Sequence, residues 1–466
     1  MTVKELVKHG PLLSALVADY ERHYPESRLA ADKARQHQID GGSHGVRLFQ
    51  PYPFRINKAA GPSVHDLDGH EIVDFWQGHF ANLLGHNPPA VTQALAEVLG
   101  HGWGLQTGMT DETQVAFADL LCQLTGAERV RFTTSGTLAT MYAIMLGRAF
   151  TGRSLVLKVR GGWHGANPMA LKGVSYGKEG FSAVESAGLI PGEGEAIVLT
   201  RYNDLTDLEQ AFARWGSELA CFILEPWMGR GGFMPASPEY LAAARELTQR
   251  HGAVLIFDEI ISGFRFCLGG LQKLYGIQPD LSTFGKIIGG GMPVAAVAGR
   301  AEVMELCGHG SSKPVAFQGG TFSAHPLAVL AGKTILEYLR QHEGEVYSRL
   351  ATLGQQLRAG IERVFAARGI LVRCTGHGNA LVPGSSLGMV HFPFEEKHTL
   401  SAPDDVWDPA LCDVEMREKL LKLGMLVHDV NVVHGLGAIS VSHTDRELNL
   451  VLEAYDAFAK RLKSVV

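Results

Sequence analysis

A single lysine, Lys286, stands among small and apolar residues in the stretch STFGKIIGGGMPVAAVAGR. This stretch, residues 282–300, contains no carboxylate, and its next basic side chain is Arg300. A buried charge without a partner is unfavourable, so Lys286 either reaches water or a partner, or is not kept as a plain ammonium ion. An ordinary surface lysine is one interpretation. A desolvated lysine is the other, because desolvation favours the neutral, nucleophilic amine.

Further reactive or polar residues follow short apolar runs of the chain. Asp258 follows VLIF, Glu225 follows CFIL, and Trp163 follows SLVLKVRGG. Ser135-Gly136-Thr137 follows VRFTT and precedes a helical pattern, which favours either an ordinary helix N-cap or an anion site built from free N–H groups and hydroxyls. In open parallel sheets, ligands bind at the carboxyl ends of the strands, where these residues are expected to meet.

Together these residues provide a lysine, a carboxylate, an anion site and a flat aromatic ring at one sheet edge. Pyridoxal 5'-phosphate needs these four groups, because it forms a Schiff base with a lysine and carries a pyridinium nitrogen that requires an acidic partner. The sequence therefore predicts a pyridoxal phosphate site that includes Lys286 and Asp258.

The elements that would position these residues alternate along the chain. Beyond about residue 100, the apolar runs VRF, SLVLKV, AIVLT, CFILEP, VLIFDE and LSTFGK are separated by helical patterns. One such helix, SPEYLAAARELTQRHG, has Ser237 as a candidate N-cap and Gly252 as a candidate end. This alternation predicts an α/β fold with a large, mostly parallel central sheet covered by helices. In SVHDLDGHEIVDF, apolar and polar residues alternate and the pattern is broken by Asp68-Gly69, which predicts a β-hairpin.

We expect three segments in the 466 residues. Residues 1–95 form an N-terminal helix and small hairpin, 96–330 the large cofactor-binding domain, and 331–466 a smaller α+β domain that opens with one long helical stretch. The net charge of −6 without a basic run argues against nucleic acid. No apolar run is long enough to span a membrane. Six cysteines without a C-x-x-C pair, and no signal-peptide pattern, indicate a cytoplasmic protein.

Motifs in the same order as in a known family run through residues 40–455. They include GGSHGVRLF, RFTTSGTLATM, GGWHG, ILEPWMGRGGF, LIFDEIISGFR, PDLSTFGKIIGGGMPVAAVAGR and QGGTFSAHPLA. The chain thus resembles the class III aminotransferases, which are fold type I pyridoxal phosphate enzymes, and within them the glutamate-1-semialdehyde aminomutase branch.

The resemblance implies a role for each matching residue. Lys286 would carry the cofactor as a Schiff base, Asp258 would pair with the pyridine nitrogen, and Ser135, Gly136 and Thr137 would hold the phosphate. Trp163 would stack on the ring. Thr321 would reach the phosphate of the neighbouring subunit, which implies a homodimer with shared active sites. Arg47 would bind a substrate carboxylate.

Several positions depart from the aminomutase pattern. GGSHGVR is one residue shorter than the usual motif, SGTLA has Leu138 where the family has an acid, and Gly435 replaces an acid that helps to accept an intermediate with two amino groups. The Gly- and His-rich segment at residues 375–408 suggests a reshaped pocket. No metal site is expected there, because His377, His391 and His398 have poor ligand spacing.

These departures favour a transaminase that moves an amino group between an amino acid and an oxo acid. The alternative is glutamate-1-semialdehyde 2,1-aminomutase. A second alternative is a non-catalytic binding protein on the same scaffold, against which the presence of both Lys286 and Asp258 counts. The partners expected are an amino donor, an oxo-acid acceptor and a second copy of the chain.

Overall fold

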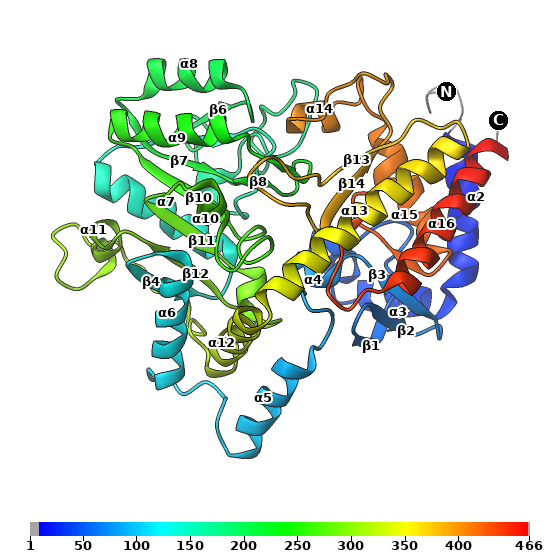
Figure 1. Cartoon of the computed structure of the whole chain (residues 1–466), viewed down its shortest axis with the longest axis horizontal. Coiled ribbons are helices and arrows are strands. Elements are labelled where there is room, and N and C mark those ends of the chain that lie inside the picture. The colour runs from blue at the N-terminus through cyan, green and yellow to red at the C-terminus, as the bar shows by residue number, and fades with distance from the viewer. Residues whose placement is uncertain (1–8, 465–466) are drawn as a thin grey trace.

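A computed structural model describes residues 9–464 of the chain (Figure 1). Its largest element is a seven-stranded sheet, in which six strands run in one direction and β12 runs against its two neighbours. The predicted mostly parallel central sheet is therefore confirmed. In spatial order the strands are β4 (Arg129–Thr133), β12 (Ala295–Gly299), β11 (Leu281–Phe284), β10 (Val254–Glu259), β7 (Leu219–Leu224), β5 (Leu155–Val159) and β6 (Ile197–Thr200).

Helices cover both faces of this sheet. On one face α7 (Gly136–Thr151) packs against the central strands through buried apolar residues such as Ala143 and Ile144. On the other face α9 (Pro238–His251) contacts β7 and β10. The sequence signals of α9 are confirmed, because the Ser237 side chain accepts a hydrogen bond from the Tyr240 N–H and Gly252 ends the helix at φ +64°.

Smaller sheets lie outside the central one. The predicted hairpin is formed by β2 (Ser63–Asp66) and β3 (Glu71–Asp74), joined by a turn in which Gly69 has φ +94°. The hairpin sheet also contains β1 (Ile56–Ala60) and β15 (Val430–Asn431). A second small sheet consists of β13 (Arg373–Thr375), β14 (Leu387–His391) and β16 (Gly437–Ala438). A third consists of β8 (Trp227–Met228) and β9 (Met234–Pro235).

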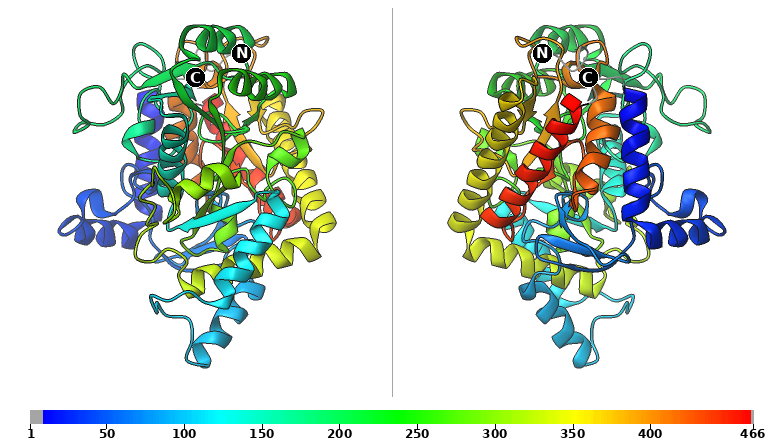
Figure 2. Two further views of the ribbon diagram at one scale, coloured as in Figure 1. Left: turned by 90° about the vertical axis from the view of Figure 1, so that its left-hand side faces the viewer. Right: turned by 90° about the vertical axis from the view of Figure 1, so that its right-hand side faces the viewer.

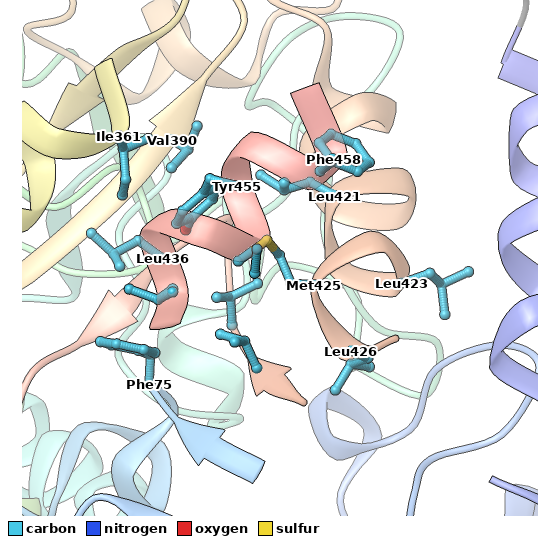
Figure 3. Close-up of a cluster of buried hydrophobic side chains, with 14 of the residues drawn as sticks. Phe75, Ile361, Val390, Leu421, Leu423, Met425, Leu426, Leu436, Tyr455 and Phe458 are labelled. Carbon is cyan, nitrogen blue, oxygen red and sulfur yellow. The ribbon is translucent and has the colours of Figure 1, made fainter. Parts of the chain in front are cut away.

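The beginning and the end of the described chain share one core. Strand β15 pairs in parallel with β3, so residues about 360 positions apart lie in one sheet. Phe75 packs in the same apolar cluster as Leu436 and Tyr455, as Figure 3 shows. Helices from both ends, α2 (His9–His23), α15 (Lys422–Leu426) and α16 (Asp445–Ser464), lie side by side in Figure 2. The division at residues 95 and 330 stays a prediction.

The long helical stretch that follows the large domain is two helices. Helix α12 (Pro326–Gln341) ends where His342 leaves the helical conformation at φ −118° and ψ 23°, and α13 (Glu343–Ala367) then begins. The break redirects the chain, because α12 packs on the core beside the large sheet, whereas most of α13 packs on the core that both ends of the described chain share (Figure 1).

The other elements connect these parts. None of the described helices is long and apolar enough to cross a membrane. The remaining helices and turns are α3 (Pro25–Arg35), η1 (Ile39–Gly41), η2 (Gly45–Arg47), α4 (Gln77–Phe80), α5 (Pro89–Gly100), α6 (Glu112–Thr125), η3 (Pro168–Ala170), α8 (Leu205–Trp215), α10 (Leu271–Tyr275), η4 (Lys286–Gly289), α11 (Ala301–Met304), η5 (Glu305–Cys307), α14 (Pro403–Trp407) and the π-helix η6 (Met416–Leu421).

Candidate active site

Residues that follow neighbouring strands of the large sheet meet around one cavity of about 830 Å³. Strand carboxyl ends are where open α/β sheets bind ligands, as the sequence analysis expected. Several residues at these strand ends line the cavity wall. They are Gly136 and Thr137 after β4, Trp163 and His164 after β5, Glu225 after β7, Asp258 in β10 and Lys286 after β11.

Lys286 occupies a tight turn at the end of β11. Its φ is +48°, a left-handed conformation that is uncommon for a residue with a side chain. A Cβ atom on Gly285 would lie 2.9 Å from Ile260 Cδ1, so the chain is closely packed just before the lysine. Burial lowers the pKa of Lys286 to about 8, although Asp258 and Glu225 oppose the shift. The neutral, nucleophilic amine is therefore more populated near neutral pH than in an ordinary lysine.

Asp258 is held in one orientation by three donors. Its Oδ2 accepts a hydrogen bond from His164 Nδ1 at 2.7 Å, and its Oδ1 accepts one from Thr283 Oγ1 at 3.0 Å and one from the Ile260 N–H at 3.1 Å. Burial lowers the pKa of His164, which favours the neutral ring despite the neighbouring carboxylate. The carboxylate of Asp258 thus lies on the cavity wall with a fixed geometry.

Glu225 is a second buried acid beside this carboxylate. Its Oε1 accepts a hydrogen bond from the Trp163 N–H at 3.0 Å, and its Oε2 accepts one from the Gly229 N–H at 2.9 Å. Burial, followed by the charge of Asp258, raises the pKa of Glu225 to about 8. Glu225 therefore fixes two segments of the cavity wall while it adds little negative charge at neutral pH.

The start of α7 presents unpaired N–H groups to the cavity. The Ser135 side chain accepts a hydrogen bond from the Leu138 N–H at 3.3 Å and so serves as the helix N-cap. The N–H groups of Gly136 and Thr137 have no acceptor among residues 9–464, and both residues line the cavity. This arrangement can hold an anion, because a helix N-terminus has free donors and a partial positive charge.

Hydrogen bonds from a buried lysine hold the loop that carries Trp163. Lys158 Nζ donates hydrogen bonds to the carbonyl oxygens of Gly162 at 3.0 Å, Ala170 at 3.0 Å and Lys172 at 2.9 Å. The Trp163 side chain is 38% exposed and lines the cavity. Its indole is therefore open to the cavity while its backbone is fixed by Lys158 and Glu225.

These observations agree with the requirements of pyridoxal phosphate. The cavity has an amine with a lowered pKa, a fixed carboxylate, a helix N-terminus with two unpaired donors, and an accessible indole. A Schiff base, a protonated ring nitrogen, a phosphate and a planar ring need these four partners. The residues present fit the cofactor.

Three predicted residues do not line this cavity: Ser135, which caps α7, Arg47 and Thr321. Arg47 is exposed in η2, and only its neighbours His44 and Val46 line the cavity. Thr321 is exposed, and its carbonyl oxygen accepts a hydrogen bond from Gln106 Nε2 at 2.7 Å. Their roles toward the substrate and toward a neighbouring subunit stay predictions.

An acid that was not singled out from the sequence faces the cavity beside His434, the neighbour of Gly435. Glu418 lines the cavity, and its Oε2 is 3.0 Å from His434 Nδ1. Burial opposes ionisation, but His434 and Arg417 outweigh burial and hold the pKa of Glu418 below its usual range. Gly435 itself has no room for a side chain, because its φ is +80° and a Cβ would lie 2.8 Å from Val390 Cβ.

The sequence analysis assigned no role to Glu418, His434, Arg230 or His79, all of which line the cavity. Burial, and then the charges of Lys286, His44 and Arg47, lower the pKa of His79 to about 3, so this imidazole is neutral. The one sequence signal that could have indicated any of these residues was for Arg230, which lies five residues after Glu225 in a glycine-rich turn.

The predicted reshaping of the pocket by residues 375–408 agrees with Trp407, which lines the cavity.

Comparisons with known proteins agree with this geometry. The sequence profile of the family described as aminotransferase class-III matches residues 47–382. Glutamate-1-semialdehyde 2,1-aminomutase of Thermoplasma acidophilum is 33% identical over 89% of this chain and 94% of its own length. The protein of the same name from Neisseria meningitidis serogroup C is 36% identical over 93% of this chain and 99% of its own.

Two solved structures have the same fold. An omega-transaminase from Sphaerobacter thermophilus is 32% identical with a TM-score of 0.84, over 94% of this chain and 98% of that one. A transaminase with pyridoxal phosphate bound is 27% identical with a TM-score of 0.82, over the same shares of the two chains.

Proposed function

The chain belongs to the class III aminotransferases, whose cofactor is pyridoxal phosphate, and from this we propose that it is a glutamate-1-semialdehyde 2,1-aminomutase. Such an enzyme moves an amino group within one substrate molecule. The names of the curated relatives favour this reaction, which the sequence analysis kept as an alternative, over transamination with an external oxo acid. Membership of an enzyme family also argues against the non-catalytic alternative.

The observation that carries the proposal is the carboxylate of Glu418 on the cavity wall. Internal transfer passes through a molecule with two amino groups, so the site must hold an ammonium group while the other nitrogen reacts. An ionised carboxylate binds ammonium through a charge-assisted hydrogen bond. Glu418 provides this carboxylate from η6, in place of the acid that the family has at position 435.

The other residues would act around the reacting nitrogen. Pyridoxal phosphate, when bound, supplies an electron sink for the carbanion. Lys286 is proposed as the nucleophile that holds the cofactor, and its Nζ as the acid–base group of the 1,3-proton shift. Asp258 would keep the pyridine nitrogen protonated. Gly136 and Thr137 would donate to the phosphate from the start of α7, and the Trp163 indole would face the ring.

External transamination between an amino acid and an oxo acid is the second candidate. The likeness to the omega-transaminase supports it, because the two chains match over nearly their whole lengths. Arg47, as the resemblance implies, would then bind a carboxylate at the mouth of the cavity. Cytoplasmic location remains a prediction in both cases.

One measurement separates the two candidates. Enzyme loaded with pyridoxamine 5'-phosphate and supplied with glutamate-1-semialdehyde alone is expected to form 5-aminolevulinate over many turnovers. Glu418→Gln should lower this rate by roughly ten- to a hundredfold, because about 1.5–3 kcal/mol of a charge-assisted hydrogen bond is lost. The matched control is Glu415→Gln, because Glu415 pairs with Lys419 outside the cavity. Product that appears only after an amino donor and an oxo acid are added would contradict internal transfer.

We also propose that the active unit is a homodimer in which Thr321 completes the phosphate site of the partner. Helix α5 and the turn after it project from the body of the protein in Figure 1. Large apolar side chains are exposed on that turn and next to Thr321, namely Leu105 at 71%, Met109 at 79% and Phe322 at 57%. Such exposure is typical of an interaction surface.

Cofactor binding is therefore expected to stabilise the dimer through linkage. Thr321→Ala should weaken the retention of pyridoxal phosphate by roughly tenfold or more, as loss of one hydrogen bond to a charged group implies. Sedimentation velocity with and without cofactor, together with equilibrium dialysis, measures both effects. A fully active monomer would exclude the shared site.

A further inference from the structure

An arginine that has no ionic partner among residues 9–464 lies on the cavity wall. Arg230 belongs to the short turn between β8 and β9, which is held by hydrogen bonds. The Gly229 N–H donates to Glu225 Oε2, and the Phe233 N–H donates to the Gly229 carbonyl oxygen at 3.0 Å. A Cβ on Gly229 would lie 2.4 Å from Ile261 Cδ1, so the turn packs closely against this side chain. The backbone therefore places Arg230 in a defined position.

The guanidinium of Arg230 uses only part of its hydrogen-bonding capacity. One nitrogen donates to the Val174 carbonyl oxygen at 2.8 Å, and another approaches Ser175 Oγ at 3.4 Å. The guanidinium carbon lies 5.8 Å from the ring centre of Trp407. Arginine has five N–H donors, so three have no acceptor in the described part of the chain. Arg230 lines the cavity, so a ligand bound there can approach the guanidinium.

The acids around Arg230 are held by other groups. Glu185 accepts hydrogen bonds from the N–H groups of Val174 at 3.1 Å and Ser175 at 2.7 Å. Glu418 is paired with Arg417 at 2.6 Å and with His434. No carboxylate oxygen of residues 9–464 lies within ion-pair distance of Arg230. A planar fork of donors in a cavity that receives an amino acid is suited to a carboxylate.

We propose that Arg230 binds the carboxylate of the substrate inside the cavity. This inference rests on the proposed function, because it assumes a small substrate that bears both a carboxylate and a reacting amino or oxo group. Arg230 and Glu418, which line the same cavity, would then be two anchors of opposite charge: the arginine holds the carboxylate and the acid holds the ammonium group that is not reacting. The exposed Arg47 acts, at most, at the mouth.

The test uses non-reactive probes and needs no turnover. Pentanoate and its neutral isostere pentanamide are titrated by calorimetry into the cofactor-loaded protein and into its Arg230→Gln, Arg230→Lys and Arg47→Gln variants. Arg201→Gln is the matched control, because Arg201 is paired with Asp405 at 2.8 Å and does not line the cavity. Thermal unfolding of each variant verifies that the fold is kept.

Arg230→Gln is expected to weaken pentanoate binding by roughly ten- to a hundredfold and to leave pentanamide unchanged. Arg230→Lys should recover part of the loss, because it keeps the charge but not the bidentate geometry. Two results would overturn the inference. One is an equal loss of affinity for pentanoate and pentanamide in Arg230→Gln, and the other is a loss of pentanoate affinity in Arg47→Gln but not in Arg230→Gln. Because binding is read without reaction, a failure here is distinct from the absence of 5-aminolevulinate formation.

Discussion

Replacement of Lys286 by alanine is expected to lower turnover by roughly 10²- to 10⁴-fold or more, because both the nucleophile and the acid–base group are removed. The fold should remain, since no hydrogen bond or ion pair of the Lys286 side chain supports it within residues 9–464. Single-turnover absorbance changes measure the chemistry, and circular dichroism melting measures the fold.

Lys273→Ala is the matched control, because Lys273 is exposed and its Nζ donates only to the Leu268 carbonyl oxygen at 3.3 Å. Its turnover should equal that of the wild type. Borohydride reduction of the cofactor-loaded protein, followed by peptide mapping, should place the label on Lys286. Label on another lysine would show that the assignment of the nucleophile is incorrect.

The lowered pKa of Lys286 adds a pH dependence. In the protein without cofactor, the rate of pyridoxal phosphate capture should rise with pH through about 8 and then level off, because the neutral amine is the reactive form. The unfolded state binds more protons than the folded state between this pKa and the ordinary value of 10.5, so this group makes stability rise with pH in that window. Lys286→Ala should remove this contribution. A capture rate that is independent of pH from 6 to 10 would contradict the lowered pKa.

Replacement of Asp258 by asparagine is the second change with a large expected effect. The carboxylate would pair with a protonated ring nitrogen in a buried site, and loss of one partner of a buried ion pair costs about 3–5 kcal/mol. The corresponding loss in turnover is roughly 10²- to 10³-fold or somewhat more. Asparagine can still accept from Thr283 Oγ1, so the local packing should be kept.

Asp280→Asn provides the control for this change. Asp280 is also buried and lies next to β11, where it pairs with Arg245 at 3.0 Å and Arg300 at 2.7 Å, but it does not line the cavity. Its replacement should lower the melting temperature without a specific effect on turnover. If both variants lose activity in proportion to stability, Asp258 is structural and its proposed role is wrong.

The sequence was sufficient to predict the sheet and the residues at its strand ends. Short apolar runs bounded by turns mark buried strands, and parallel strands place their carboxyl ends at one edge. Lys286, Asp258 and Trp163 were therefore expected together, and all three line the cavity. Local chemistry also predicted the limits of α9, since an N-cap and a left-handed glycine act within a few residues.

Other features depend on contacts between distant segments. Glu418 lies in a helix of the C-terminal segment and Arg230 in the turn between β8 and β9, yet both line the same cavity. Neither side chain stands at a strand end. The glycine-rich turn after Glu225 was the one local signal for Arg230, and nothing in the immediate sequence distinguishes Glu418 from a surface charge. Neither residue was therefore assigned a role from the sequence alone.

The sequence alone determined which residues are suited to chemistry at the sheet edge, because periodicity, caps and turns are local properties of the chain. Only the tertiary structure decided what surrounds that edge. The break at His342 and the pairing of β15 with β3 bring the C-terminal segment over the cavity. That placement is set by the burial of apolar side chains from both ends of the chain in one core. The hydrophobic effect that drives this burial has no preferred direction, and it depends on the total apolar surface that all segments together remove from water.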